Sequence, residues 1–223
     1  MKNKQKILQG LASAVFWISV PLVVIFCLSP IQKFINDPSK SGVGWYACAA
    51  CFLAIMWPLS RSDYDENPSK TAWQTKFIYG WWLFWVSVDL TTILYLRWKV
   101  GNWDLGALQL LMIYVSLGCF VAVWFVSVLY GWRMKNSYVR AAISIAWKSV
   151  SQFLLAWAVW NTGRGDWVLP ALIAGILTIV ARLTQVGVSV TVDGWTHQRR
   201  AITISEAVNL GSWLAVVAVW SVK

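Results

Sequence analysis

The sequence predicts an all-α, polytopic membrane protein with seven transmembrane helices. Three observations support this fold class: 58% of the 223 residues are apolar, only 13% are charged, and 18 are Trp. About a quarter of the residues in a soluble domain are charged, so this composition is typical of a membrane protein. Intrinsic disorder is excluded because it requires low hydrophobicity together with high charge.

A spanning helix needs about 20 mostly apolar residues, because its backbone polar groups must be satisfied within the segment. Seven runs meet this condition, at approximately 11–29, 43–60, 77–96, 105–132, 141–160, 168–190 and 201–222. The fourth run is the longest and is expected to tilt or to extend past the bilayer. The connections are short and rich in turn-forming residues, so we expect one transmembrane domain over residues 1–223.

The first run follows Lys2, Lys4 and Lys6, as the apolar part of a signal peptide would. Its length of about 18 residues and its lack of a small-residue cleavage site favour an uncleaved first span. With the N-terminus in the cytoplasm, eleven of the 19 Lys and Arg residues lie inside and six lie outside. The outer six are Lys33, Lys40, Arg97, Lys99, Arg164 and Lys223. This distribution predicts an N-in, C-out topology, most simply in a bacterial-type inner membrane.

Tryptophan is concentrated near the ends of the predicted spans, where the indole ring favours the headgroup region. Residues at predicted outer ends are Trp45, Trp98, Trp103, Trp160, Trp167 and Trp220. Residues at predicted inner ends are Trp57, Trp73, Trp132 and Trp195. We therefore expect most of them to anchor the protein at the two interfaces, while deeper ones pack between helices or line a cavity.

Two segments of the chain match in register and suggest an internal repeat. Trp85–Trp98 reads WVSVDLTTILYLRW and Trp147–Trp160 reads WKSVSQFLLAWAVW. They are followed by GNWDLGAL at Gly101–Leu108 and GDWVLPAL at Gly165–Leu172. Parallel helical-hairpin repeats would explain these matches and occur in some transporters, with a ligand site near the midplane. The alternative is chance similarity in a chain rich in Trp, Ser and Val.

Four ionisable residues lie within predicted spans, namely Asp89, Lys148, Arg182 and Glu206. Each costs about 2.5–3.5 kcal/mol at a helix centre, so each is expected to face the bundle and find a partner. At about 1.5 Å per residue, the last three share one layer in the inner half of spans five to seven. The amides within about one helical turn of them are Gln152, Gln185 and Asn209. We interpret these seven residues as a substrate-binding site. There are two alternatives: a fully paired buried network that fixes helix register, or a Lys148 side chain that simply snorkels to the interface.

Cysteine and histidine suggest a further hypothesis but no metal site. Cys48 and Cys51 form a CxxC pair near the predicted outer face, where disulfides can persist. This layout resembles that of quinone-linked membrane thiol oxidoreductases. A second pair is lacking, since only Cys119 lies elsewhere in the later spans, and free Cys commonly behaves as a small apolar residue. The single His197 and the absence of a P-loop or GxGxxG motif indicate neither a metal nor another cofactor.

The leading functional hypothesis is a small-molecule or ion transporter, either a facilitator or ion-coupled. The first alternative is a non-catalytic structural or assembly subunit of a larger membrane complex, and the second is the thiol oxidoreductase. An enzyme is the less favoured class. The expected partners are the lipid bilayer and either other membrane subunits or further copies in a homo-oligomer. The net charge of +10 does not predict nucleic-acid binding, because the basic residues are scattered among apolar runs.

Overall fold

A computed structural model describes residues 2–38, 42–163 and 167–223 of the chain. Within them the protein is all-helical, with 87% helix and no strands, and seven helices are long and apolar enough to span a membrane. The helices are α1 (Lys2–Leu28), α2 (Ile31–Asn36), α3 (Val43–Glu66), α4 (Lys70–Lys99), α5 (Gly106–Leu129), α6 (Ser137–Ser144), α7 (Val150–Thr162), α8 (Leu169–Asp193) and α9 (His197–Val222). A π turn, Ile145–Ser149, joins α6 to α7 without interruption, and these three segments form the fifth span.

Most spans begin or end outside the boundaries expected from hydropathy, and those that start at α4, α6 and α9 begin at a capping side chain. The third span extends back to Lys70, where the Ser69 hydroxyl accepts a hydrogen bond from the Ala72 amide at 3.1 Å. The expected end of the fourth span at residue 132 is wrong. α5 ends at Leu129, and Gly131 follows with φ +64°, a conformation that favours glycine and terminates helices. At 30 residues, α4 is therefore longer than the 24-residue α5.

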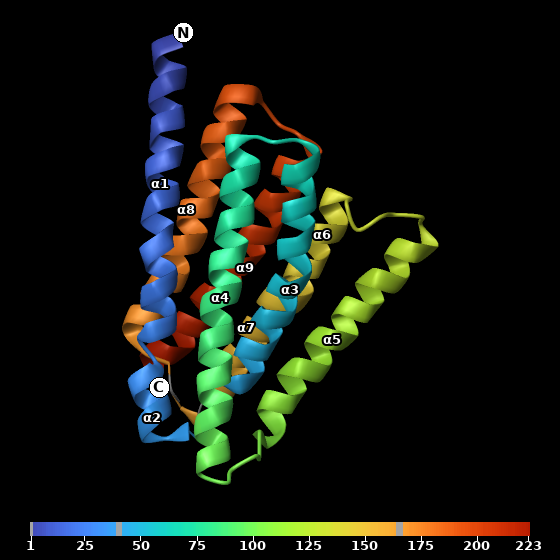
Figure 1. Cartoon of the computed structure of the whole chain (residues 1–223). Helices are drawn as coiled ribbons and strands as arrows, with labels where there is room; N and C mark the ends of the chain where they lie inside the picture. Colours follow the sequence, from blue (N-terminus) through green and yellow to red (C-terminus); the bar gives the residue numbers. More distant parts are fainter. Residues whose placement is uncertain (1, 39–41, 164–166) are drawn as a thin grey trace.

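The helices alternate in direction through the bundle (Figure 1). The N-terminus lies at the same end as the α3–α4 and α8–α9 connections, while the C-terminus lies at the other end. α1 packs against α4 and α8, α3 packs against α4, and α9 packs against α7 and α8. α5 leans away from the bundle and contacts α3 and the α6–α7 segment.

The N-in, C-out topology and the helical-hairpin repeat both remain predictions. The alternation of the helices fits N-in, C-out as well as its inverse. Lys40 and Arg164, which count toward the orientation, and Gly165, which begins the second repeat turn, lie outside the described residues. The two matched segments also differ locally, since Trp85 lies in the continuous helix α4 whereas Trp147 lies in the π turn.

An aromatic cluster closes the bundle at the end away from the N-terminus. Phe26, Trp45, Trp167 and Trp213 are 0%, 6%, 5% and 3% exposed, with ring centroids 5.2–6.0 Å apart. Trp45 and Trp167 are therefore core residues and not the interface anchors expected from their position in the sequence. The exposed residues Trp98, Trp103, Trp132, Trp160 and Trp195 keep the exposure expected of anchors.

Gly44 brings α3 and α5 into close contact. Its amide donates to Oε1 of Gln109 at 2.7 Å, and an added Cβ would lie 2.7 Å from the Gln109 main-chain oxygen. We expect Gly44→Ala to lower the free energy of unfolding by about 1–3 kcal/mol, because it overpacks a backbone contact. Gly118→Ala in α5 is the matched control, since nothing lies within 4 Å of its added Cβ. Thermal denaturation in detergent compares the two, and equal melting temperatures would contradict the prediction.

Candidate functional site

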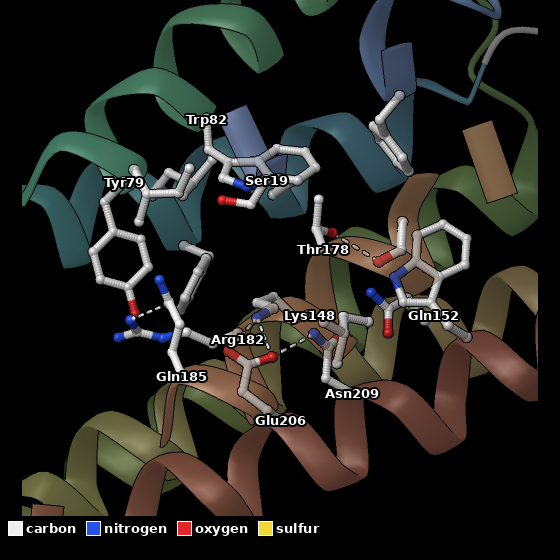
Figure 2. Close-up of a pocket in the computed structure, with 18 of the residues that line it drawn as sticks. Ser19, Tyr79, Trp82, Lys148, Gln152, Thr178, Arg182, Gln185, Glu206 and Asn209 are labelled. Carbon is white, nitrogen blue, oxygen red and sulfur yellow. Dashed lines mark hydrogen bonds and ion pairs between the residues drawn. The ribbon is translucent and has the colours of Figure 1, made fainter. Parts of the chain in front are cut away.

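A cavity of about 880 Å³, including open solvent at its mouth, lies inside the bundle and is shown in Figure 2. Residues of α1, α3, α4, α8, α9 and the π turn with α7 line it. Six of the seven residues predicted from the sequence lie around this cavity: Lys148, Gln152, Arg182, Gln185, Glu206 and Asn209. The structure therefore brings together polar side chains from three separate helical segments.

Lys148 and Glu206 form an ion pair across the cavity wall. The Lys148 ammonium nitrogen lies 3.4 Å and 3.5 Å from the two carboxylate oxygens, and the side chains are 19% and 11% exposed. Nδ2 of Asn209 donates to Oε2 of Glu206 at 2.9 Å. The ammonium group also lies 5.1 Å from the centroid of the Phe52 ring, within cation–π range. Glu206 thus has a cation and an amide as partners.

The π turn determines which way Lys148 faces. Each residue of an α-helix advances the chain by about 100° around the axis, so the extra residue of a π turn rotates the following helix relative to the preceding one. Lys148 lies inside this turn and Gln152 lies in the first turn of α7, and both line the cavity. The segment contains neither Pro nor Gly, so the sequence gives no signal for the irregularity.

In the part of the chain that the structure describes, the hydrogen-bond partners of Arg182 in α8 are neutral. Its guanidinium group donates to Oε1 of Gln185 and to Oγ1 of Thr75, each at 3.4 Å, beyond the usual range of a strong hydrogen bond. No carboxylate lies within 4.0 Å of it among the described residues. Lys148 and Arg182 share a predicted layer with Glu206, so the sequence allows Glu206 to pair with either cation. The structure pairs it with Lys148 and, among the described residues, places no carboxylate within ion-pair distance of Arg182.

Two buried amides complete the polar wall. Oε1 of Gln152 accepts a hydrogen bond from the Ser212 hydroxyl, and both residues are buried. Asn209 is 2% exposed, and its Oδ1 atom has no hydrogen-bond partner in the part of the chain that the structure describes. Because Nδ2 of Asn209 donates to Glu206, the free atom is the acceptor oxygen.

A second cavity of about 590 Å³ adjoins the first, and Tyr79, Arg182 and Glu206 line both. It extends toward Asp63 and Arg140, which form a two-pronged ion pair whose Nη2–Oδ1 distance is 2.9 Å. Sequence reasoning missed Tyr79 and this ion pair. Asp63 and Arg140 are 77 residues apart and lie outside the predicted spans, so no local signal in the sequence links them.

Asp89 lies apart from the other six predicted residues. It is 0% exposed in α4 and lines neither cavity. Neither carboxylate oxygen has a partner that meets hydrogen-bond geometry among the described residues, and the Cys27 thiol of α1 is the group beside it. Asp89 is thus placed as a residue of the α1–α4 contact.

The four cysteines are free, and the CxxC pair is divided between two environments. Cys48 is buried, with its thiol 3.7 Å from the Met112 carbonyl oxygen, while Cys51 is exposed. This arrangement does not favour a dithiol centre. Among the described residues, no group of three His, Cys, Asp or Glu side chains is placed to hold a metal ion.

Comparisons with family models, with curated proteins and with solved structures give no match. The fold and the site are therefore the basis for any functional argument. The fold supports a multi-pass helical membrane protein whose bundle encloses a charged cavity.

Proposed function

We propose that the protein transports a small polar or charged solute across a membrane, with its site between the fifth, sixth and seventh spans. The observation that carries this proposal is Arg182, a cation within a span that lines two adjoining cavities and has no carboxylate within 4.0 Å among the described residues. Charges within spans are costly, and those that face water-filled cavities commonly mark a solute pathway. A network that served only to fix helix register would be expected to pair every charge.

The arrangement of the two cavities supports this proposal. The smaller one lies toward the Asp63–Arg140 ion pair, and the larger one extends to the aromatic cluster near Trp45 and Trp213. They meet at Arg182 and Glu206, where an ion or solute would pass from one to the other. In the proposed N-in topology the smaller cavity is on the cytoplasmic side. Whether transport is facilitated or ion-coupled, alternating access would open each end in turn.

Cysteine accessibility tests this pathway. In a chain whose four native cysteines are replaced by Ala, Ser19→Cys places a thiol in the larger cavity and Ser205→Cys places one in the smaller. Ser116→Cys is the matched control, since Ser116 is 0% exposed and lines neither cavity. We expect a membrane-impermeant maleimide to label position 19 from both sides of oriented vesicles and to leave position 116 unlabelled.

Labelling that differs from this pattern is informative in either direction. If Ser19→Cys reacts from one side only, transport is contradicted, and the cavity is then interpreted as the site of a binding protein. Absence of reaction at both cavity positions, with the protein folded by gel filtration, would favour the alternative of a structural subunit. That alternative has one observation in its favour, namely the long exposed apolar face of α5, which lipid or a partner helix would cover.

A further inference from the structure

The cavity carries one positive charge in excess. Lys148, Arg182 and Glu206 are the charged residues that line it, and Glu206 is already engaged by Lys148. The remaining charge is the Arg182 guanidinium, whose two side-chain acceptors are neutral and 3.4 Å away. A cationic ligand would add to this excess, and a neutral ligand would leave it uncompensated in a membrane-embedded site. An anion compensates it, and a planar carboxylate matches the donor fork of arginine.

The opposite part of the cavity is aromatic. Phe26, Trp45, Trp82 and Trp213 line it, and they approach one another mainly edge-to-face or tilted, with ring centroids 5.2–5.9 Å apart. Gly175 lies in this wall, where an added Cβ would be 3.2 Å from the Phe26 ring. Walls of this kind favour a flat apolar body, because rings gain from stacked or edge contacts with other rings.

Asn209 supplies a third, independent observation. It is 2% exposed and lines the cavity, and its free Oδ1 atom can only accept a hydrogen bond. A buried acceptor without a partner is costly, so a ligand with an O–H or N–H group would recover that cost. Arg182, the aromatic wall and Asn209 together favour a ligand that has a negative charge, an aromatic ring and a hydrogen-bond donor.

We propose that the cavity binds a planar aromatic carboxylate that carries a hydroxyl or N–H donor, with the carboxylate on Arg182 and the ring against the aromatic wall. This inference rests on the proposed function for its biological role, since the bound molecule would be the transported solute. Its chemistry rests on Arg182, Asn209 and the aromatic wall alone.

Equilibrium binding of radiolabelled para-hydroxybenzoate to the full chain in lipid nanodiscs tests the proposal. Four competitors each change one feature: para-hydroxybenzamide removes the charge, benzoate removes the donor, para-hydroxybenzylamine reverses the charge, and inorganic phosphate removes the ring. We expect saturable binding of the acid, with the amide weaker by about 10- to 100-fold, as expected for a lost charge-assisted hydrogen bond. Equal competition by acid and amide, or no saturable binding, would overturn the proposal without requiring any variant.

Substitutions then locate the site. Arg182→Gln is expected to weaken binding by the same factor of about 10 to 100, while Arg182→Lys keeps part of the affinity. Arg61→Gln is the matched control, because Arg61 is 63% exposed in a surface pair with Asp65. Unchanged affinity in a folded Arg182→Gln protein would refute the assigned role of Arg182.

The two proposals fail in different ways. If the protein binds the acid selectively but proteoliposomes show no exchange of the acid across their membrane, transport is contradicted and the ligand class is kept. Two-sided labelling of Ser19→Cys without discrimination between acid and amide would keep transport and contradict the ligand class.

Discussion

Replacing Glu206 with Gln is expected to lower the free energy of unfolding by about 3–5 kcal/mol, the cost of leaving a buried charge unpaired. The carboxylate is the acidic partner of Lys148, and both side chains are largely buried at 11% and 19% exposure. Glutamine keeps the shape and an acceptor for Asn209 but removes the negative charge. Thermal or denaturant unfolding in detergent, followed by tryptophan fluorescence, measures the change.

A surface ion pair provides the matched control. Lys135 and Glu66 also form an ion pair, but their side chains are 54% and 58% exposed. Glu66→Gln is therefore expected to change the unfolding free energy by about 1 kcal/mol or less. The double variant Lys148→Met/Glu206→Leu removes both charges. Its free energy of unfolding should fall by less than the sum of the falls caused by Lys148→Met and Glu206→Leu separately. A Glu206→Gln protein as stable as the parent would contradict this prediction and show that the Lys148 charge does not depend on Glu206 for its stabilisation.

Phe26→Ala is expected to lower the free energy of unfolding by a similar amount, about 3–5 kcal/mol. Phe26 is 0% exposed, and its ring centroid lies 5.2–6.0 Å from those of Trp45, Trp82, Trp167 and Trp213. Its removal leaves a void among large rigid rings that cannot collapse around it. Phe26 also lines the cavity, so the Phe26→Ala variant should also bind an aromatic ligand more weakly.

The control for this substitution is Phe125→Ala in α5, since Phe125 is 56% exposed on the outer face of the bundle. We expect a change within about 0.5 kcal/mol there, as for other exposed positions. Near-ultraviolet circular dichroism during thermal unfolding reports the aromatic cluster directly. Similar melting temperatures for the two alanine variants would contradict the core role of Phe26.

The sequence by itself determined the number of spans, their order and the ionisable residues that lie within them. Hydropathy is a property of consecutive residues, so seven runs predicted seven spanning helices. The unusual cost of a charge in a span singled out Lys148, Arg182 and Glu206, and those three do line one cavity. Span ends were less predictable, because one residue such as Gly131 stops a helix within a run that is still apolar.

Only the tertiary structure decided which of these residues face one another. The sequence left Glu206 with two possible cations and placed Asp89 with the others, whereas the packed bundle pairs Glu206 with Lys148 and separates Asp89. It also buries Trp45 at an end where hydropathy predicted an interface anchor. The physical reason is rotation. Depth along a helix follows from counting residues, but the direction of a side chain depends on packing and, at Lys148, on a π turn that shifts every later position around the helix.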